Sequence, residues 1–328
     1  MKKFFKILAY IVGGLAVLIA AFLIYFNNTY PKVDPPSTEK VEITPARLER
    51  GKYLAHHVTV CMDCHSTRDW NKFSGPPIPG TLGQGGDKFD KETAGIPGVL
   101  YAKNITPAGI SRYTDGELMR TITNGVTKEG KALFPLMPYL GYNHLTKEDL
   151  YSIVAYIRSL QSINNNVPEG SLNFPLNLIV KTIPPKSFVP SPEPDRNNSA
   201  EYGKYLVGIA GCFDCHTQQI KGEYQMHKAF GGGFEFGFPA GVVRSANISP
   251  DEISGIGNWT KEQFVSRFKM MNPDSNQIAQ VNFMKEFNTP MPWTMYAGMT
   301  RDDLGAIYDF LRTVKPVKNP VVKFTPNP

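Results

Sequence analysis

The N-terminal part of the chain carries a long apolar run. Residues 7–26 contain no charge, and a helix of this length would cross a bilayer once. Three lysines lie among the first six residues and no charge follows the run before Lys32, which favours a cytoplasmic N-terminus. A cleaved signal peptide is the alternative, but its apolar region would be shorter and would end at a small-residue site. We therefore predict an uncleaved transmembrane anchor over residues 1–28.

Apolar residues recur at helical spacing in two later segments, each opened by a threonine that can cap a helix. A further short helix is predicted over residues 47–57. Strand-like alternation is sparse, so we expect a mainly α fold. The apolar positions are Leu150, Ile153, Val154 and Ile157 after Thr146, and Leu304, Ile307, Phe310 and Leu311 after Thr300.

The second half of the chain repeats the first, which indicates a tandem duplication. In one matched pair, 114–117 with 260–263, the pattern is a capping box that opens a helix. Five matches keep the same order: 49–54 with 201–206, 104–107 with 247–250, 114–117 with 260–263, 137–139 with 291–293, and 146–150 with 300–304.

This duplication divides the chain into segments. We expect the linker to be ordered, with its apolar patch 172–183 packed on one of the domains, and the stalk to lift the domains off the membrane. The predicted segments are the anchor (1–28), a stalk (29–45), a first domain (46–163), a proline-rich linker (164–198), a second domain (199–316) and a C-terminal tail (317–328).

Composition adds two limits. The 27 prolines and 29 glycines predict long ordered loops between the helices. The net charge of +6 includes the three N-terminal lysines on the cytoplasmic side, so little positive charge is left for the domains. This balance argues against nucleic-acid binding.

All four cysteines lie in two Cys-x-x-Cys-His motifs, at Cys61, Cys64 and His65 and at Cys212, Cys215 and His216. This pentapeptide is the attachment signal of c-type haem: the thiols bind the haem covalently and the histidine becomes the proximal iron ligand. A zinc site would need both cysteine pairs close in space, and a thioredoxin-like pair would follow a strand. Because both motifs are complete, we predict two covalently bound haem c groups.

A second axial ligand would make each haem an electron carrier. Met137 and Met291 occupy matching places in the repeat, each before a proline and a closing helix, and thioether sulfur suits haem iron. Four histidines are weaker alternatives: His56 and His57 lie too near their own cassette, and neither His144 nor His227 is repeated. The remaining methionines are expected to pack in the core; those considered are Met119, Met226, Met270, Met271, Met284, Met295 and Met299.

Four further residues are candidates for the haem pocket. Asn104 and Asn247 open a duplicated Asn-Ile-(Thr/Ser)-Pro motif. They either shape a turn or bind a haem propionate. Tyr113 and Trp259, just before the capping boxes, either pack structurally or contact the haem edge.

The combined pattern resembles membrane-anchored, multi-haem class I cytochromes c, and in particular the cytochrome c subunits of periplasmic alcohol and gluconate dehydrogenases. The phrases that carry the resemblance are Gly-Lys-Tyr-Leu at 51–54, Asn-Ile-Thr-Pro at 104–107, Leu-Phe-Pro-Leu-Met-Pro-Tyr at 133–139, the helix 150–160, Gly-Gly-Gly-Phe at 231–234 and Gly-Ile-Gly-Asn-Trp-Thr at 255–260.

The resemblance implies two small helical cytochrome c domains, with His65 and Met137, and His216 and Met291, as axial ligands. It also implies that two helix glycines approach the closing helices, Gly51 near Tyr156 and Gly203 near Phe310. One feature departs from the family: those subunits typically carry three haems, whereas this chain has two motifs and an N-terminal anchor. A dehydrogenase partner is therefore only one of the options.

These observations predict an electron-transfer protein without substrate turnover, held in the cell membrane with its haem domains on the periplasmic side. Its partner would be a dehydrogenase, a quinol-oxidising complex or a terminal oxidase. The alternative is a dihaem enzyme such as a cytochrome c peroxidase with one open haem, against which the two matched methionines argue. A haem-based sensor is disfavoured for the same reason.

Overall fold

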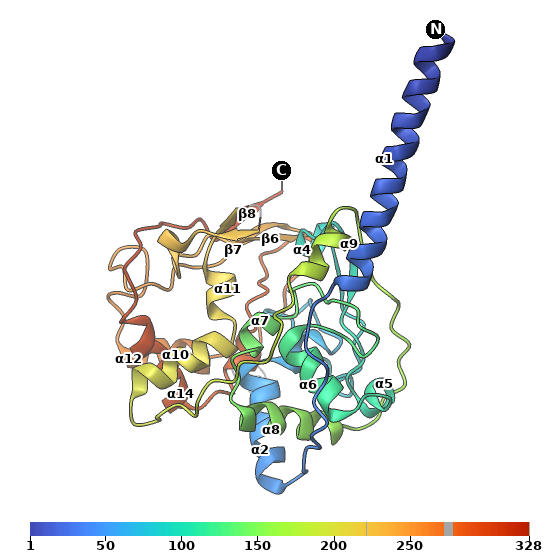
Figure 1. Cartoon of the computed structure of the whole chain (residues 1–328). Helices are drawn as coiled ribbons and strands as arrows, with labels where there is room; N and C mark the ends of the chain where they lie inside the picture. Colours follow the sequence, from blue (N-terminus) through green and yellow to red (C-terminus); the bar gives the residue numbers. More distant parts are fainter. Residues whose placement is uncertain (221, 272–277, 328) are drawn as a thin grey trace.

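The computed structural model describes residues 1–220, 222–271 and 278–327. Helix α1 (Lys2–Thr29) rises away from the rest of the molecule (Figure 1). None of its residues is buried. Within the described residues it is the one helix long and apolar enough to cross a membrane, a property that a signal sequence shares.

Two helix pairs form the centre of the repeats. In the first repeat (46–163) α2 (Pro45–Tyr53) crosses α8 (Lys147–Arg158), and in the second (199–316) α10 (Ser199–Ile209) crosses α14 (Arg301–Leu311). A methyl group on Gly51 would lie 1.9 Å from the Ser152 carbonyl oxygen and 2.7 Å from Cβ of Tyr156. Only glycine allows this approach.

The matching glycine of the second repeat, Gly203, also lies against its closing helix. A methyl group there would come within 1.8 Å of the Ala306 carbonyl oxygen, so the nearest atoms belong to Ala306 and Ile307 rather than to Phe310, the residue expected. The predicted close crossing of both helix pairs is thus confirmed, and the contact residue in the second pair is corrected.

The smaller helices follow the duplication in part, because two short helices of the first repeat have no counterpart in the described part of the second. The capping boxes predicted at Thr114 and Thr260 are both present. In the first repeat the helices are α3 (Cys61–Cys64), α4 (Lys91–Ala94), α5 (Pro107–Ile110), α6 (Asp115–Asn124) and α7 (Tyr139–Tyr142), with the π-turn η1 (Leu54–Val58) after α2. In the second they are α11 (Cys212–His216), α12 (Lys261–Lys269) and α13 (Trp293–Tyr296), with the 3₁₀ turn η3 (Met226–Lys228).

Short strands complete each repeat. The antiparallel sheet β1 (Lys88–Asp90), β2 (Gly98–Tyr101), β3 (Ser171–Leu172) takes its last strand from the linker. The equivalent sheet β6 (Glu235–Phe238), β7 (Gly241–Arg244), β8 (Phe324–Pro326) takes its last strand from the C-terminal tail. The structural unit of each repeat therefore extends past the predicted domain ends. A separate hairpin pairs β4 (Gln219–Ile220) with β5 (Glu223–Tyr224).

The proline-rich linker is ordered and lies on the first repeat. Asn143 Nδ2 donates to the Ser187 carbonyl oxygen at 3.0 Å, and Asn124 Nδ2 donates to that of Pro185 at 2.8 Å. The patch 172–183, which includes α9 (Leu176–Ile179) and η2 (Val180–Thr182), packs only in part: Val180 is buried, whereas Phe174 is largely exposed.

The predicted stalk does not lift the repeats away from α1. Residues 30–44 run down the side of the first repeat (Figure 1). Asp34 N–H donates to the Lys186 carbonyl oxygen at 2.8 Å, and Val41 N–H donates to Asp115 Oδ2 at 2.9 Å. The first repeat consequently lies beside the base of α1.

The two repeats share one buried apolar cluster, and a reciprocal pair of tyrosines joins them. Tyr53 donates its hydroxyl to Asp303 at 2.5 Å and accepts from Thr300 N–H at 3.1 Å. Its counterpart Tyr205 donates to Asp149 at 2.6 Å and accepts from Thr146 N–H at 3.2 Å. The hydroxyl of each tyrosine therefore lies at the N-terminus of the closing helix of the other repeat.

Candidate haem-binding sites

Both Cys-x-x-Cys-His cassettes begin in the same way. The residue before the first cysteine is in the left-handed conformation, Val60 with φ 44° and Gly211 with φ 67°. A short helix follows in each cassette, α3 from Cys61 to Cys64 and α11 from Cys212 to His216. All four cysteines are free. Among the described residues no three His, Cys, Asp or Glu side chains are grouped in a way that could hold a metal ion.

The cassette histidines have matching hydrogen bonds. His65 Nδ1 bonds the carbonyl oxygen of Lys103 at 2.7 Å, and His216 Nδ1 bonds that of Ala246 at 2.7 Å. A carbonyl accepts, so each Nδ1 carries the proton and each Nε2 is left with a lone pair. Burial lowers the pKa of both rings, while the bond to the carbonyl opposes that shift. Neutral imidazole with a free Nε2 and a fixed Nδ1–H is the state that binds a metal.

The accepting carbonyls belong to the residues just before the duplicated asparagines. Asn104 Oδ1 accepts from Thr106 N–H at 2.9 Å and from Thr106 Oγ1 at 2.7 Å; Asn247 makes the same pair of bonds with Ser249. Each Nδ2 reaches the chain that leaves its repeat, at Ile163 O (2.8 Å) and Val317 O (2.6 Å). These contacts are those of a structural turn; a propionate contact stays a prediction.

Sequence reasoning missed this role of Lys103 and Ala246, because a backbone carbonyl leaves no residue-type signal. It also missed a duplicated glycine pair at 85–86 and 232–233. The first glycine of each pair donates its N–H to the carbonyl oxygen of the cassette histidine, Gly85 at 2.9 Å and Gly232 at 2.8 Å. Both have positive φ, 71° in each case. The pairs begin 20 and 16 residues after their cassette histidines, so only an alignment of the two halves with a four-residue gap would have revealed it.

Met137 and Met291 lie in identical tight turns. The Met137 carbonyl oxygen accepts from Tyr139 N–H at 2.7 Å, and that of Met291 accepts from Trp293 N–H at 2.8 Å. Both side chains are half-buried and pack against the shared apolar cluster. Their role as iron ligands stays a prediction.

Two of the alternative histidine ligands, His56 and His57, have hydrogen-bond partners of their own. His56 Nε2 bonds the Tyr156 hydroxyl at 2.7 Å, and His57 Nδ1 bonds the Met295 carbonyl oxygen at 2.9 Å. Of the remaining methionines, Met119, Met295 and Met299 are buried as expected. The packing expectation is wrong for Met226, Met270 and Met284, which are mostly exposed.

Tyr113 and Trp259 again take equivalent places. Their carbonyl oxygens accept hydrogen bonds that hold the entry to α6 and α12, from Arg158 Nη2 and from the Tyr308 hydroxyl, both at 2.5 Å. Tyr113 is half-buried, and Trp259 lies at the surface. A haem contact by either side chain stays a prediction.

A loop of the first repeat holds the Met291 turn of the second. Ser74 is fully buried with φ 68°. Its hydroxyl donates to the Met291 carbonyl oxygen at 2.6 Å and accepts from Trp293 N–H at 2.9 Å. Its own N–H donates to Asn288 Oδ1 at 2.8 Å. The Met137 turn shows no equivalent contact from the second repeat among the hydrogen bonds of the described residues.

The same loop is tied to the first cassette. Arg68 pairs with Asp63 at 3.1 Å, and both side chains are buried. Arg68 also donates to the carbonyl oxygens of Gly75 (2.8 Å) and Ser74 (3.0 Å). Burial raises the pKa of Asp63 to about 6, and Arg68 opposes that shift. The first cassette and the Met291 turn are therefore connected through one buried ion pair.

A buried tyrosine in each repeat bonds the segment just before the cassette of that repeat. Tyr142 donates its hydroxyl to the Thr59 carbonyl oxygen and Tyr296 to that of Ala210, both at 2.6 Å. Burial raises the pKa of both tyrosines well above the usual range. A carboxylate of the opposite repeat also raises each pKa: Asp214 raises that of Tyr142, and Asp63 raises that of Tyr296.

These residues fit covalent haem. Each cassette offers two free thiols and an oriented histidine. In addition, the Tyr139 hydroxyl is fully buried and has no partner among the described residues, as expected for a group that would bind a cofactor oxygen.

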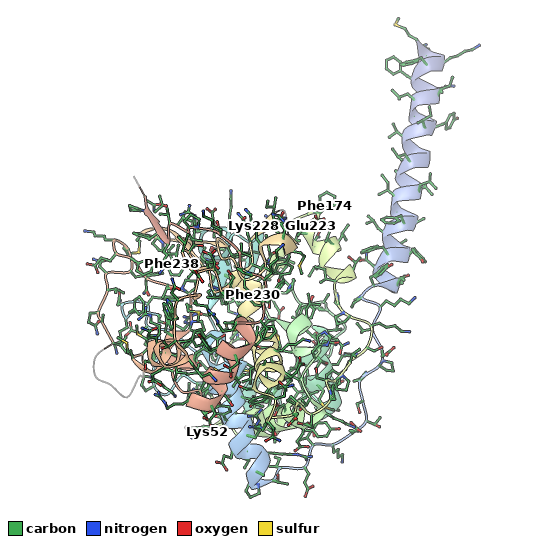
Figure 2. All side chains as sticks on the ribbon, turned by 90° about the vertical axis from the view of Figure 1, so that its left-hand side faces the viewer. Lys52, Phe174, Glu223, Lys228, Phe230 and Phe238 are labelled. Carbon is green, nitrogen blue, oxygen red and sulfur yellow. The ribbon has the colours of Figure 1, made fainter. Side chains whose placement is uncertain are left out.

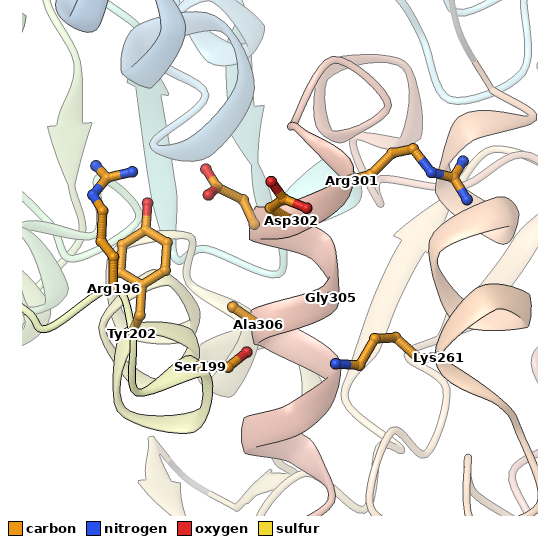
Figure 3. Close-up of a pocket in the computed structure, with 9 residues that line it drawn as sticks. Arg196, Ser199, Tyr202, Lys261, Arg301, Asp302, Gly305 and Ala306 are labelled. Atoms are coloured by element: carbon orange, nitrogen blue, oxygen red, sulfur yellow. The ribbon is translucent and has the colours of Figure 1, made fainter.

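A polar pocket of about 400 Å³ lies elsewhere, between α10 and α14 (Figure 3). Its cations have local partners: Lys261 pairs with Asp309 at 2.6 Å, Arg301 with Glu262 at 2.5 Å, and Arg196 lies over the Tyr202 ring at 4.7 Å. The pocket contains no cassette residue. We assign no ligand to it.

Comparison with known proteins agrees with the geometry. The Cytochrome c family model matches residues 200–315. The alcohol dehydrogenase (quinone) cytochrome c subunit of Gluconacetobacter polyoxogenes is 27% identical over 302 residues, covering 86% of this chain and 59% of that protein. The fructose dehydrogenase cytochrome subunit of Gluconobacter japonicus is 29% identical, with coverages of 70% and 47%. The gluconate 2-dehydrogenase cytochrome c subunit of Pantoea cypripedii is 26% identical, with coverages of 66% and 49%.

The chain thus spans about half of the length of these relatives, or slightly more. The predicted resemblance is confirmed: residues 200–315 match the Cytochrome c family, and the chain is similar to the cytochrome c subunits of alcohol, fructose and gluconate dehydrogenases.

Proposed function

We propose that this chain is a membrane-tethered dihaem cytochrome c that relays single electrons, with a dehydrogenase as its donor. The observation that carries the proposal is the identical orientation of His65 and His216, each fixed through Nδ1 by a backbone carbonyl at 2.7 Å. The dehydrogenase partner rests on the names of the relatives. They do not favour the peroxidase alternative.

Haem iron, when bound, supplies reversible one-electron transfer. The cysteines of each cassette would hold the group covalently. The Lys103 and Ala246 carbonyls keep Nε2 of each histidine directed away from the backbone and strengthen it as a donor. Met137 and Met291 would provide the sixth ligands. The buried cluster around them excludes water, which favours a stable pair of oxidation states over substrate chemistry.

The arrangement of the repeats suits electron relay between two centres. The repeats share one buried core and are joined by the two reciprocal tyrosine contacts, so the two sites would keep a fixed separation. Helix α1 would hold the protein in the membrane with its N-terminus in the cytoplasm and both repeats in the periplasm.

Absorption spectra with a haemochrome assay test the proposal. We expect two haems per chain, both low-spin, with the far-red sulfur-to-iron band in the oxidised state. Met137→Ala and Met291→Ala should each remove about half of that band and lower one reduction potential. Met284→Ala, an exposed methionine, serves as the control and should change neither. One haem per chain, or a spectrum unaffected by both ligand variants, would contradict the proposal.

A further inference from the structure

The apolar part of the linker leaves several side chains without protein partners. Phe174 is 79% exposed and Ile179 is 49% exposed, and Leu176 and Leu178 are half-buried beside them. We call these four residues the α9 patch. An exposed apolar cluster is a candidate contact with a protein partner, a ligand or a membrane.

The patch is held firmly in place. Val180 is buried, and Asn173 N–H donates to the Pro97 carbonyl oxygen at 2.9 Å. Strand β3, just before Phe174, pairs with β2 of the first repeat. The exposed side chains therefore stand on a fixed part of the fold.

Its position points to one occupant. Lys181 Nζ donates to Asn27 Oδ1 at 2.6 Å, which joins the end of the patch to the last turns of α1. Figure 1 shows α9 beside the lower part of α1, and the perpendicular view of Figure 2 shows Phe174 on the same side of the repeats, at the level of those turns. If α1 crosses the membrane, its last turns lie in the outer leaflet, and the patch is carried to the same depth.

The backbone of the patch can enter an apolar layer at low cost. Asn177 N–H donates to Asn173, and the N–H groups of Leu178 and Ile179 both donate to the Pro175 carbonyl. These bonds satisfy groups that would otherwise need water. The flanking Lys181 and Lys32 can reach headgroup phosphates, and Asn173 and Asn177 suit the interfacial layer.

We propose that the α9 patch inserts into the outer interface of the bilayer as a second membrane contact, fixing the tilt of the repeats against the membrane. This inference rests on the proposed role of α1 as an anchor.

Photolabelling of the full chain tests it. The haem-loaded protein is reconstituted in phosphatidylcholine and phosphatidylglycerol vesicles that contain a phospholipid with a diazirine on its acyl chain. After irradiation and tryptic digestion, lipid adducts are mapped to peptides 7–32, 159–181 and 245–261. We expect adducts on the first two peptides and none above background on the third.

Variants make the result specific. Phe174→Ser with Ile179→Ser should remove most adducts from peptide 159–181 and leave those on 7–32. Ile253→Ser is the matched control: Ile253 is also 79% exposed, but it lies in the loop leading to α12, a helix that Figure 1 shows far from α1. It should leave both adduct-bearing peptides unchanged. An unchanged haem spectrum shows that each variant has folded.

The outcomes separate the two proposals. Adducts on peptide 7–32 with none on 159–181 would overturn the inference and leave the anchor in place, and the patch would then be available to a protein partner. Adducts on neither peptide would contradict the proposed role of α1 as a membrane anchor.

Discussion

At the scale of single residues, Ser74 has the most informative environment. It adopts φ 68°, a conformation that costs energy for a residue with a side chain, and it is fully buried. Its hydroxyl bonds the turn that contains Met291, although Ser74 itself belongs to the other repeat. Such strain persists only where surrounding contacts maintain it.

We therefore expect Ser74→Ala to loosen the Met291 turn selectively. Loss of two buried hydrogen bonds should lower the free energy of unfolding by about 1–2 kcal/mol. The far-red band and the potential of one haem should change while those of the other stay as in the wild type, as measured by a spectroscopic redox titration. Ser159→Ala is the control, since that hydroxyl bonds only within its own exposed helix end. Equal changes at both haems would refute a selective role.

His56 gives the stability of the protein a pH dependence. Burial, helped by the nearby His57 and Lys52, lowers the pKa of His56 to about 4. The unfolded chain takes up a proton near pH 6.5 and the folded chain does not, so acid favours unfolding. The contribution of His56 to the free energy of unfolding is fully present above pH 6.5. It is lost as the pH falls toward 4, and the loss is about 2 kcal/mol after allowance for partial exposure.

Urea unfolding at a series of pH values measures this effect. His56→Gln should flatten the profile between pH 6.5 and 4, whereas His227→Gln, at an exposed position, should leave it unchanged. A profile that is the same in wild type and His56→Gln would show that another group is responsible.

At the scale of elements, the closing helices α8 and α14 depend on residues from the opposite repeat. A helix N-terminus leaves N–H groups without partners, and here a threonine cap satisfies one while a tyrosine hydroxyl accepts from the cap residue itself. The same hydroxyl donates to the aspartate of the first turn. The contacts that hold the two repeats together are therefore the same contacts that cap the closing helices.

Removal of either tyrosine hydroxyl should weaken both the contact between the repeats and the cap of one closing helix. We expect Tyr53→Phe and Tyr205→Phe each to lower the free energy of unfolding by about 1.5–3 kcal/mol, because a largely buried carboxylate loses a donor. Tyr151→Phe removes a comparable bond to the exposed Glu39 and should cost under about 1 kcal/mol. Equal losses in all three variants would contradict an interdomain role.

Much at this scale could be predicted from the sequence. The threonine caps, the capping boxes and the glycines at the helix crossings are local patterns, and the structure contains all of them. The edge strands β3 and β8 could not be predicted, because each has only two or three residues and pairs with a strand far away in the sequence. The carbonyls of Lys103 and Ala246 escaped because orientation of a histidine by backbone leaves no side-chain signature.

At the scale of the whole molecule, the position of the repeats against α1 was not predictable. The prolines near residues 31–36 suggest a free rigid spacer. Instead, the backbone N–H groups of Asp34 and Val41 donate hydrogen bonds that hold the segment against the first repeat and the linker packed on it. Such contacts depend on tertiary structure rather than composition. The repeats are consequently held beside the base of the helix.

Replacing residues 1–26 by a cleavable secretion signal should yield a protein with both haems found mainly in the soluble fraction, because a few interfacial side chains cannot replace a spanning helix. Fractionation after a high-salt wash, with haem content per chain, measures this. A product that stays in the membrane fraction would show that α1 is not the main attachment.

The reciprocal tyrosines carry an implication for the origin of the molecule. Tyr53 with Asp303 and Tyr205 with Asp149 are the same contact made twice in opposite directions, which is the pattern of a two-fold symmetric homodimer. A single ancestral repeat with this tyrosine and this aspartate would already have paired with its own copy. Fusion of two such copies would make the pairing permanent and free the halves to diverge, and Ser74 is one such difference, since among the described residues it bonds the Met291 turn and not the Met137 turn.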